Sequence, residues 1–371
     1  MNNSIRQADR NQWVLHDYLQ VNGGAERLVS TIARGIPSFS LGVSGTYPGF
    51  SDSANLSGVD LRLLSQLPKW LPRIPKALLT FGRRMPCIEN ADAVIYSGVY
   101  APLAVKSQKR GHRIYYCHTP PRFAFDRKNE YVGNLPVPVR SLVSIAIDAY
   151  RQAYKEAVGE MDVILTNSDH MRKRLAEQLG VDAYVVYPPV DVNVFRWQAQ
   201  GDYYLSLGRL EPNKRVDRVV KAFMKMPEKK LIVASGGSQL ETLRNLARGA
   251  SNIIFIGWSS DEQLIDLIAN AIACIYIPLD EDFGMSAIES MAAGKPLIGV
   301  AEGGMLETVI DGQTGILLPP NPAIEQIAVA VLDMTAHLAL SMRDRCEQRA
   351  MDFTEERFLE RISAFVIGQT G

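Results

Sequence analysis

Short apolar runs alternate with glycine loops and helical segments in the first half of the chain. Residues 13–17 form the first run, residues 21–24 a loop, and residues 25–34 have helical composition and spacing. This order of strand, glycine loop and helix is typical of an α/β unit. The same pattern predicts later strands and one helix, which Ser168 is placed to cap, at residues 93–96, 113–117, 162–166 and 169–179.

The second half repeats this alternation more clearly. Helical segments separate the apolar runs, and terminal helices are predicted at residues 323–334 and 355–367. Strands that alternate with helices through short glycine loops indicate a parallel, doubly wound sheet, whose ligands bind at the carboxyl ends of its strands. The predicted strands are residues 203–207, 231–234, 253–256, 273–277 and 297–300.

The alternation breaks at Pro188 and Pro189, because consecutive prolines are incompatible with a helix or a central strand. A hinge is therefore expected in residues 191–202. A chain of 371 residues is also long for one core and suits two domains of similar size.

The composition is that of a globular protein, with 47% hydrophobic and 22% charged residues. No apolar run approaches the ~20 residues that a membrane helix needs, and residues 1–11 lack the apolar segment of a signal peptide. We therefore expect a cytoplasmic protein. Four scattered cysteines without metal-ligand spacing are expected to be free thiols.

The net charge is zero, but residues 61–125 hold eleven Lys and Arg against two acids, a net charge of +9. Such a stretch indicates an anionic partner, for which nucleic acid and an anionic membrane surface are candidates. No nucleic-acid-binding module accompanies it.

An acidic loop, residues 280–285, follows a predicted buried strand and precedes a helix predicted at residues 286–293. Glu281 lies in the loop and Glu289 one turn into the helix, so they reach different parts of one ligand. The free amides and dipole at a helix start can hold an anion such as a diphosphate. The alternative is that the acids merely stabilise the helix.

A second loop, residues 208–215, also follows a strand and opens a helix. Arg209 offers a planar fork and Lys214 a point charge, and both could reach one phosphate pair. A solvated charged turn is the alternative. Gly236 and Gly237 form a third loop at the same sheet edge.

The segment at 281–318, EDFGMSAIESMAAGKPLIGVAEGGMLETVIDGQTGILL, strongly resembles glycosyltransferase family 4. Seven residues separate Glu281 from Glu289, the E-x7-E pattern of retaining glycosyltransferases. The segments that fit the same family elsewhere are GRLEPNKRVD at 208–217, GGAE at 23–26, NSDHMRKRL at 167–175 and YPPVD at 187–191.

The resemblance implies the α/β fold called GT-B, in which two Rossmann-like domains with parallel doubly wound sheets face a cleft. Residues 1–195 would bind the acceptor and residues 196–352 the donor, and residues 353–371 would form a helix crossing back to the first domain. The family needs no metal or other cofactor. Asp280, Glu281 and Asp282 spell D-x-D, but metal binding is not expected in this context.

The resemblance also implies roles in donor binding. Arg209 and Lys214 would neutralise the leaving diphosphate, where fixed cations lower the barrier. Glu281 would contact the donor sugar and Glu289 the ribose. The backbone at Phe283, Gly284, Met285 and Ser286 would hold the sugar hydroxyls or phosphate, and the glycines that let the donor approach would be Gly23, Gly24, Gly208 and Gly236.

His118 ends the run at 113–117 and resembles a family histidine near the reacting sugar, although a lone histidine is more often structural. It would hydrogen-bond the sugar without acting as a nucleophile. The surrounding string CHTPPRFAFD resembles bacterial mannosyltransferases that use GDP-mannose to build O-antigen lipopolysaccharide. UDP-sugars and other GDP-sugars remain alternatives.

The acceptor implied is a lipid-linked oligosaccharide, with the enzyme peripheral on the cytoplasmic face of the inner membrane. A surface that mixes cations with apolar side chains suits anionic headgroups; solvated loop charges are the alternative. The residues predicted on the acceptor or membrane side are Ser168, Trp70, Arg73, Lys76, Arg83 and Arg84. Rival functions are a GT-B nucleotide-sugar epimerase and a non-catalytic nucleotide-sugar-binding protein.

Overall fold

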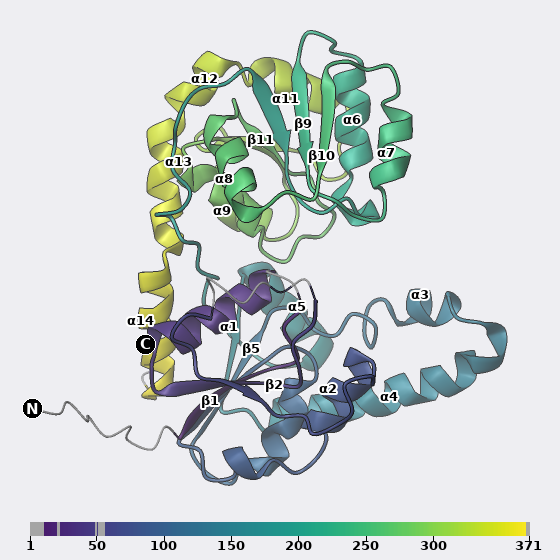
Figure 1. Ribbon diagram of the computed structural model, residues 1–371, viewed down its shortest axis with the longest axis vertical. Coiled ribbons are helices and arrows are strands. Elements are labelled where there is room, and N and C mark those ends of the chain that lie inside the picture. Colours follow the sequence, from purple (N-terminus) through teal and green to yellow (C-terminus); the bar gives the residue numbers. More distant parts are fainter. Residues whose placement is uncertain (1–10, 21–22, 49, 51–55, 369–371) are drawn as a thin grey trace, which may run out of the picture. The chain divides into compact units, whose positions relative to one another are not determined.

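The computed structural model describes residues 11–20, 23–48, 50 and 56–368. The chain forms two compact units (Figure 1). One comprises Met1–Pro188 with Phe358–Gly371, and the other comprises Pro189–Arg357.

The first unit contains a parallel sheet of seven strands in the order β3-β2-β1-β4-β5-β6-β7. The order runs outward in opposite directions from β1 and β4, so the chain reverses its direction of sheet growth between these neighbours. The strands are β1 (Gln12–His16), β2 (Phe39–Val43), β3 (Leu61–Leu63), β4 (Ala93–Ser97), β5 (His112–Cys117), β6 (Val163–Thr166) and β7 (Tyr184–Val185).

Side chains on a strand alternate between the two faces of its sheet. Here a hydrophobic core covers each face. In β4, Val94 and Tyr96 pack into a core with α4, while Ile95 packs into a second core with α1 and α14. Ser168 caps α5 as predicted by accepting a hydrogen bond from Met171 N at 3.0 Å. The helices are α1 (Gly24–Gly35), α2 (Arg73–Phe81), η1 (Pro86–Ile88), η2 (Ala101–Ser107), α3 (Lys128–Gly133), α4 (Val137–Gly159), α5 (Asp169–Leu179) and α14 (Glu355–Val366).

The second unit contains a parallel sheet of six strands in the order β10-β9-β8-β11-β12-β13. Its order reverses between β8 and β11, which repeats the topology of the first unit. The strands are β8 (Tyr203–Ser206), β9 (Lys230–Ala234), β10 (Ile253–Gly257), β11 (Cys274–Ile275), β12 (Leu297–Val300) and β13 (Gly315–Leu318).

Helices connect these strands, and one continuous core runs through the unit. The helices are η3 (Pro212–Lys214), α6 (Val216–Met224), α7 (Leu240–Leu246), α8 (Asp261–Asn270), α9 (Met285–Ala292), α10 (Met305–Thr308), α11 (Ile324–Asp333), α12 (Ala336–Ser341), α13 (Arg343–Ala350) and η4 (Met351–Phe353). The predicted doubly wound parallel sheets are therefore confirmed in both units.

The sequence pattern does not predict four of the observed strands, namely β2, β3, β7 and β13. Two of these, β3 and β7, have only three and two residues. The 23-residue helix α4 also escapes it, because its first half exposes apolar side chains such as Val137, Leu142 and Ile145. No helix within the described ranges is long and apolar enough to cross a membrane.

Candidate functional site

The first candidate site lies at the strand-order reversal of the second unit. Ligands of doubly wound sheets bind where the order reverses, because neighbouring loops diverge there. Residues 207–214, which end in η3, follow β8, and residues 276–284 follow β11. A hydrogen bond from Leu279 N to Asn213 O, 2.7 Å long, ties the two loops together. The predicted residues Lys214 and Glu281 therefore come from adjacent loops.

Lys214 is the centre of a compact polar cluster. Its Nζ donates hydrogen bonds to Oε2 of Glu281 and to the hydroxyl of Tyr276, both at 2.7 Å. The Lys214 and Glu281 side chains are mostly buried, with 15% and 20% of their surfaces exposed. Burial strengthens this pair compared with an exposed one, because less water screens the charges.

Tyr276 is a member of this cluster that the sequence pattern does not single out as functional. Burial and then the charge of Glu281 raise the pKa of its hydroxyl well above the usual range, so the phenol stays neutral. It hydrogen-bonds Glu281 as well as Lys214. Gly208 makes room for the ring, since a Cβ there would lie 2.8 Å from a Tyr276 ring carbon.

The remaining predicted charges also act on Tyr276. Arg209 is exposed, and its positive charge opposes the rise in the Tyr276 pKa, while Glu289 adds to it. Glu289 is only 6% exposed within α9. The structure thus gathers Arg209, Lys214, Glu281 and Glu289 around one tyrosine.

The acidic loop is shaped by Gly284, which begins α9 with a φ of +94°. That conformation favours glycine, and a Cβ there would also lie 2.6 Å from the sulfur of Met305. Phe283 turns inward and packs edge-on against Phe353 at 5.7 Å between ring centroids. Because the Phe283 side chain faces the core, only its backbone can take the predicted part in binding sugar hydroxyls or phosphate. Met285 and Ser286 lie at the start of α9, where the same backbone role is predicted.

A loop after β12 supports the acidic loop from behind. Gly304 N donates to Glu281 O at 2.9 Å, and a Cβ on Gly303 would lie 2.3 Å from the same oxygen. Glu302 accepts hydrogen bonds from Arg215 at 2.6 Å and from Asn321 N at 2.7 Å. Glu302 and Arg215 therefore hold together the loops of the candidate site after β8 and β12, a role that the sequence pattern does not reveal.

The third predicted loop, after β9, sits against Trp258. A Cβ on Gly236 would lie 2.3 Å from the indole nitrogen, so only glycine leaves room for this ring. The indole is 72% exposed. Ser238 is linked to the loop after β8 by donating to Glu211 at 2.6 Å.

The strand-order reversal of the first unit holds a second candidate site. Ser97 Oγ ends β4 and lies 3.1 Å from Nδ1 of His16 and 2.9 Å from Nε2 of His118. Because a hydroxyl has one hydrogen to donate, Ser97 can donate to one ring and accept from the other. Burial lowers the pKa of His16 to about 4 and that of His118 to about 3. Both imidazoles are therefore neutral near pH 7.

Asp17 follows His16 and is held by backbone amides. Its carboxylate accepts hydrogen bonds from Val99, Tyr100 and Ala101, each at 2.8 Å, at the start of η2. Burial nevertheless raises its pKa to about 6. Gly98 permits this contact, because it has a φ of +102° and a Cβ would lie 2.6 Å from the carboxylate.

The other predicted site residues of the first unit differ in burial and in their place in the fold. Gly23 and Gly24 begin α1, with Gly23 at the N-cap, while residues 21 and 22 of the same loop lie outside the described residues. Ser168 is fully buried as a helix cap. Trp70, Arg73, Arg83 and Arg84 are exposed.

Lys76 is different, because it is buried with 9% exposure. Its Nζ approaches the loop after β2, since a Cβ built on Gly45 would lie 3.6 Å from it. Within the described part of the chain, no group of His, Cys, Asp or Glu is arranged to hold a metal ion.

Family models match both halves of the chain. Residues 191–352 match the family described as glycosyl transferases group 1, and residues 22–194 match glycosyltransferase family 4. An alpha-1,3/1,6-mannosyltransferase of Dictyostelium discoideum is 28% identical over 58% of this chain and 60% of its own length. A D-inositol 3-phosphate glycosyltransferase of Mycobacterium bovis is 30% identical over 53% of this chain and 45% of its own length. The matched region thus spans roughly half of these relatives.

Solved structures share the fold over nearly the whole chain. Anabaena HepE in complex with UDP and glucose has a TM-score of 0.72 at 15% identity and covers 96% of this chain and 99% of its own. WaaG, a glycosyltransferase involved in lipopolysaccharide biosynthesis, has a TM-score of 0.72 at 14% identity, with coverage of 96% and 100%. The predicted GT-B fold is confirmed.

The buried histidines predict a loss of stability in acid. The usual histidine pKa of 6.5 falls to about 3 for His118, so between these values the unfolded chain binds a proton that the folded chain does not. His118 therefore contributes stability that is present above pH 6.5 and is lost as the pH falls. Asp17, with its raised pKa, acts in the opposite direction.

We expect His118→Gln to unfold at a lower urea concentration than the wild type at pH 7 and to lose less stability between pH 6.5 and 4. The difference between the two free energies of unfolding should change by up to about 1.4 kcal/mol per pH unit. Because Asp17 is present in both proteins, its effect cancels. Parallel pH profiles for the two proteins would show that His118 keeps an ordinary pKa.

Proposed function

We propose that this chain, which belongs to glycosyltransferase family 4, transfers a sugar from a nucleotide-sugar donor to an acceptor with retention at the anomeric carbon. The observation that carries this proposal is the Lys214–Glu281–Tyr276 cluster at the strand-order reversal of the second unit. It combines a cation for a leaving diphosphate with a carboxylate for sugar hydroxyls. The family models that match residues 22–352 support the same activity.

Donor binding would exchange partners within this cluster. Lys214 is held by Glu281, so a diphosphate that enters beside Lys214 and Arg209 competes for the ammonium group. Glu281 then becomes free to accept hydrogen bonds from the donor sugar. Each charge keeps a partner throughout, which avoids the large cost of leaving a buried charge unpaired.

The start of α9 and the buried Glu289 complete the proposed donor site. The first amides of a helix lack partners within it and favour an anion or a hydroxyl oxygen. Glu289 would accept hydrogen bonds from the ribose hydroxyls. Fixed cations at the leaving diphosphate lower the barrier because negative charge develops there.

His118 would hydrogen-bond the reacting sugar as a neutral imidazole. Its Nε2 faces Ser97, and its low pKa excludes the charged form near pH 7. We assign it no nucleophilic role. The leaving phosphate would help to deprotonate the acceptor hydroxyl on the same face of the sugar. Attack from that face retains the anomeric configuration, so an α-linked donor would give an α-linked product.

Mannose from GDP-mannose is the proposed donor, with a lipid-linked oligosaccharide of O-antigen or another polysaccharide as the acceptor. The string CHTPPRFAFD and the similarity to a mannosyltransferase of Dictyostelium discoideum support this choice. A UDP-sugar is the alternative donor, since HepE was solved with UDP. An epimerase or a non-catalytic nucleotide-sugar-binding protein would use the same fold without making a glycosidic bond.

The first unit would also bind an anionic membrane surface. Trp70 is 80% exposed, and α2 exposes Ile74 and Leu78 beside the basic residues that flank it. These apolar groups can enter the headgroup layer while the cations meet anionic lipids. The exposed cations at this surface are Lys69, Arg83 and Arg84.

Variants of the cluster separate donor binding from transfer. We expect Glu281→Gln to lower turnover by about 100-fold or more without weakening the binding of the nucleoside diphosphate, because Lys214 loses a competitor. Lys214→Met should weaken that binding by about 10-fold or more. Turnover and calorimetric titration with GDP measure the two effects.

The matched control is Glu241→Gln, which breaks an exposed ion pair of the same unit with Arg244 at 3.0 Å. It should leave turnover and GDP binding unchanged, since exposed pairs contribute little. Near-wild-type turnover of a folded Glu281→Gln variant would sink the assignment of this cluster.

Membrane binding is tested by flotation with vesicles that contain phosphatidylglycerol. We expect the wild type to float at low salt and to dissociate at high salt, because salt screens the charges. Replacing Lys69, Arg83 and Arg84 by Gln should abolish flotation. The same replacement at Lys225, Arg244 and Arg248 of the second unit should not, and equal flotation of both triple variants would contradict this surface.

A further inference from the structure

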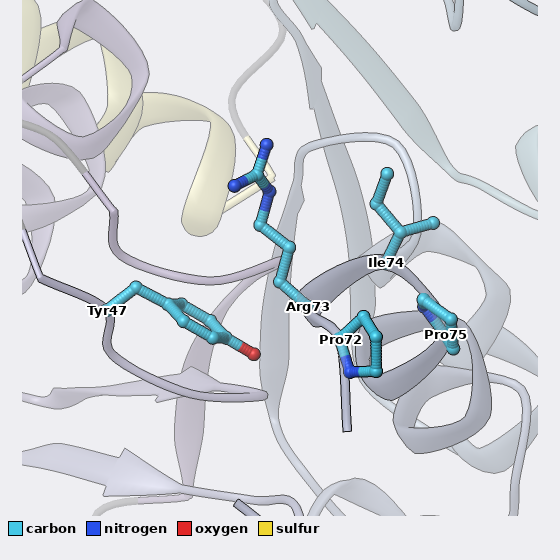
Figure 2. A pocket seen from close by; sticks show the side chains of 5 residues that line it. All are labelled: Tyr47, Pro72, Arg73, Ile74 and Pro75. Atoms are coloured by element: carbon cyan, nitrogen blue, oxygen red, sulfur yellow. The ribbon is translucent and has the colours of Figure 1, made fainter. Parts of the chain in front are cut away.

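A cavity of about 380 Å³ opens in the first unit, away from the His16–Ser97–His118 contacts. It is lined by Tyr47, from the loop after β2, and by the start of α2 at Pro72, Arg73, Ile74 and Pro75. Figure 2 shows the Tyr47 hydroxyl directed toward the segment that carries Arg73. The cavity therefore has a polar side and an apolar side.

Two cations adjoin the polar side without ion-pair partners. Neither Arg73 nor Lys76 lies within ion-pair distance of a carboxylate in the described ranges, whereas nearby Arg84, Lys106 and Arg122 all form ion pairs. Lys76 is also more than nine-tenths buried. Two neighbouring cations without a described carboxylate partner create a positive potential that favours an anion.

The Tyr47 hydroxyl is a third polar group at the same place. It is shielded from solvent and has no hydrogen-bond partner among the residues that the structure describes. A Cβ built on Gly45 would lie 3.5 Å from this hydroxyl and 3.6 Å from Nζ of Lys76, so both groups approach one point. Because Gly45 has no side chain, that point stays open.

The surrounding contacts hold these groups in place. The Arg73 guanidinium lies 5.8 Å from the centre of the Tyr18 ring. Tyr18 in turn packs edge-on against Tyr47 at 5.8 Å. Asp17, which precedes Tyr18, already accepts hydrogen bonds from three backbone amides. The cluster is therefore preorganised and cationic.

We propose that Arg73, Lys76 and Tyr47 bind a phosphate group of the glycosyl acceptor. A phosphate ester offers several oxygens, which suits donors converging from a guanidinium, an ammonium and a phenol. This inference rests on the proposed function, because it assumes that the first unit takes the acceptor. The proposed site would recognise the diphosphate that joins the glycan of the acceptor to its lipid.

The apolar side of the cavity suits the lipid. Pro72, Ile74 and Pro75 line it, and Ile74 continues onto the exposed apolar surface with Trp70 and Leu78. A chain attached to a phosphate at Arg73 would thus run over apolar side chains. The proposed membrane surface and the phosphate site would then bind different parts of the same molecule.

Binding of farnesyl diphosphate to the full chain tests this site by calorimetry, with farnesol and inorganic pyrophosphate as further probes. We expect farnesyl diphosphate to bind, pyrophosphate to bind more weakly and farnesol not to bind. Arg73→Gln should weaken farnesyl diphosphate binding by about 10-fold or more. Tyr47→Phe, which removes only the hydroxyl, should weaken it by several-fold.

The control variant is Lys106→Gln, a cation of the same basic stretch that pairs with Glu156 at 2.9 Å and does not line the cavity. It should bind farnesyl diphosphate like the wild type, and every variant should bind GDP normally in the second unit. Farnesyl diphosphate affinity that is unchanged in both Arg73→Gln and Tyr47→Phe would overturn the site. So would equal binding of farnesol and farnesyl diphosphate.

These results are separable from the proposed function. If GDP-mannose and every other donor fail but farnesyl diphosphate binding still depends on Arg73, the transferase proposal fails and the phosphate site remains. If transfer occurs but Arg73→Gln reduces only binding to phosphatidylglycerol vesicles, the cavity recognises headgroups and the acceptor site is overturned.

Discussion

The order of parallel strands is the constraint on which both sites depend. Each sheet grows outward in two directions from a central pair, β1 with β4 and β8 with β11. The loops after such a pair lead to opposite faces of the sheet, so their first residues stand beside an opening that backbone does not fill. His16 and Ser97 share one such position, and the loops that carry Lys214 and Glu281 share the other.

The charged side chains at the two strand-order reversals are paired with specific partners or kept neutral by burial. Lys214 and Glu281 neutralise each other, and Arg215 and Glu302 do the same behind them. In the first unit, burial keeps His16 and His118 neutral, and three amides hold Asp17. Arg73 and Lys76 differ in having no carboxylate partner among the described residues, which is why we propose a ligand there.

The sequence predicts the residues that flank strands better than those within them. Lys214 and Glu281 stand in charged loops beside glycines, so pattern and family resemblance both mark them. The sequence pattern does not mark Tyr276 and His16 as functional, because each lies near the end of an apolar run that is predicted to be a buried strand. Lys76 differs from the other cations of its stretch: a run of basic residues indicates an exposed surface, but this residue of α2 is mostly buried. Glu302 contacts distant residues, and no local pattern reveals such contacts.

The central proposal is that this chain makes a glycosidic bond from a nucleotide sugar. The most direct measurement is the release of nucleoside diphosphate from GDP-mannose with and without a lipid diphosphate-linked glycan, with the product examined by NMR. The account predicts release that requires the acceptor, in equal amount with a new α-linked sugar. Release without the acceptor, isomerised donor, or a β-linked product would contradict it.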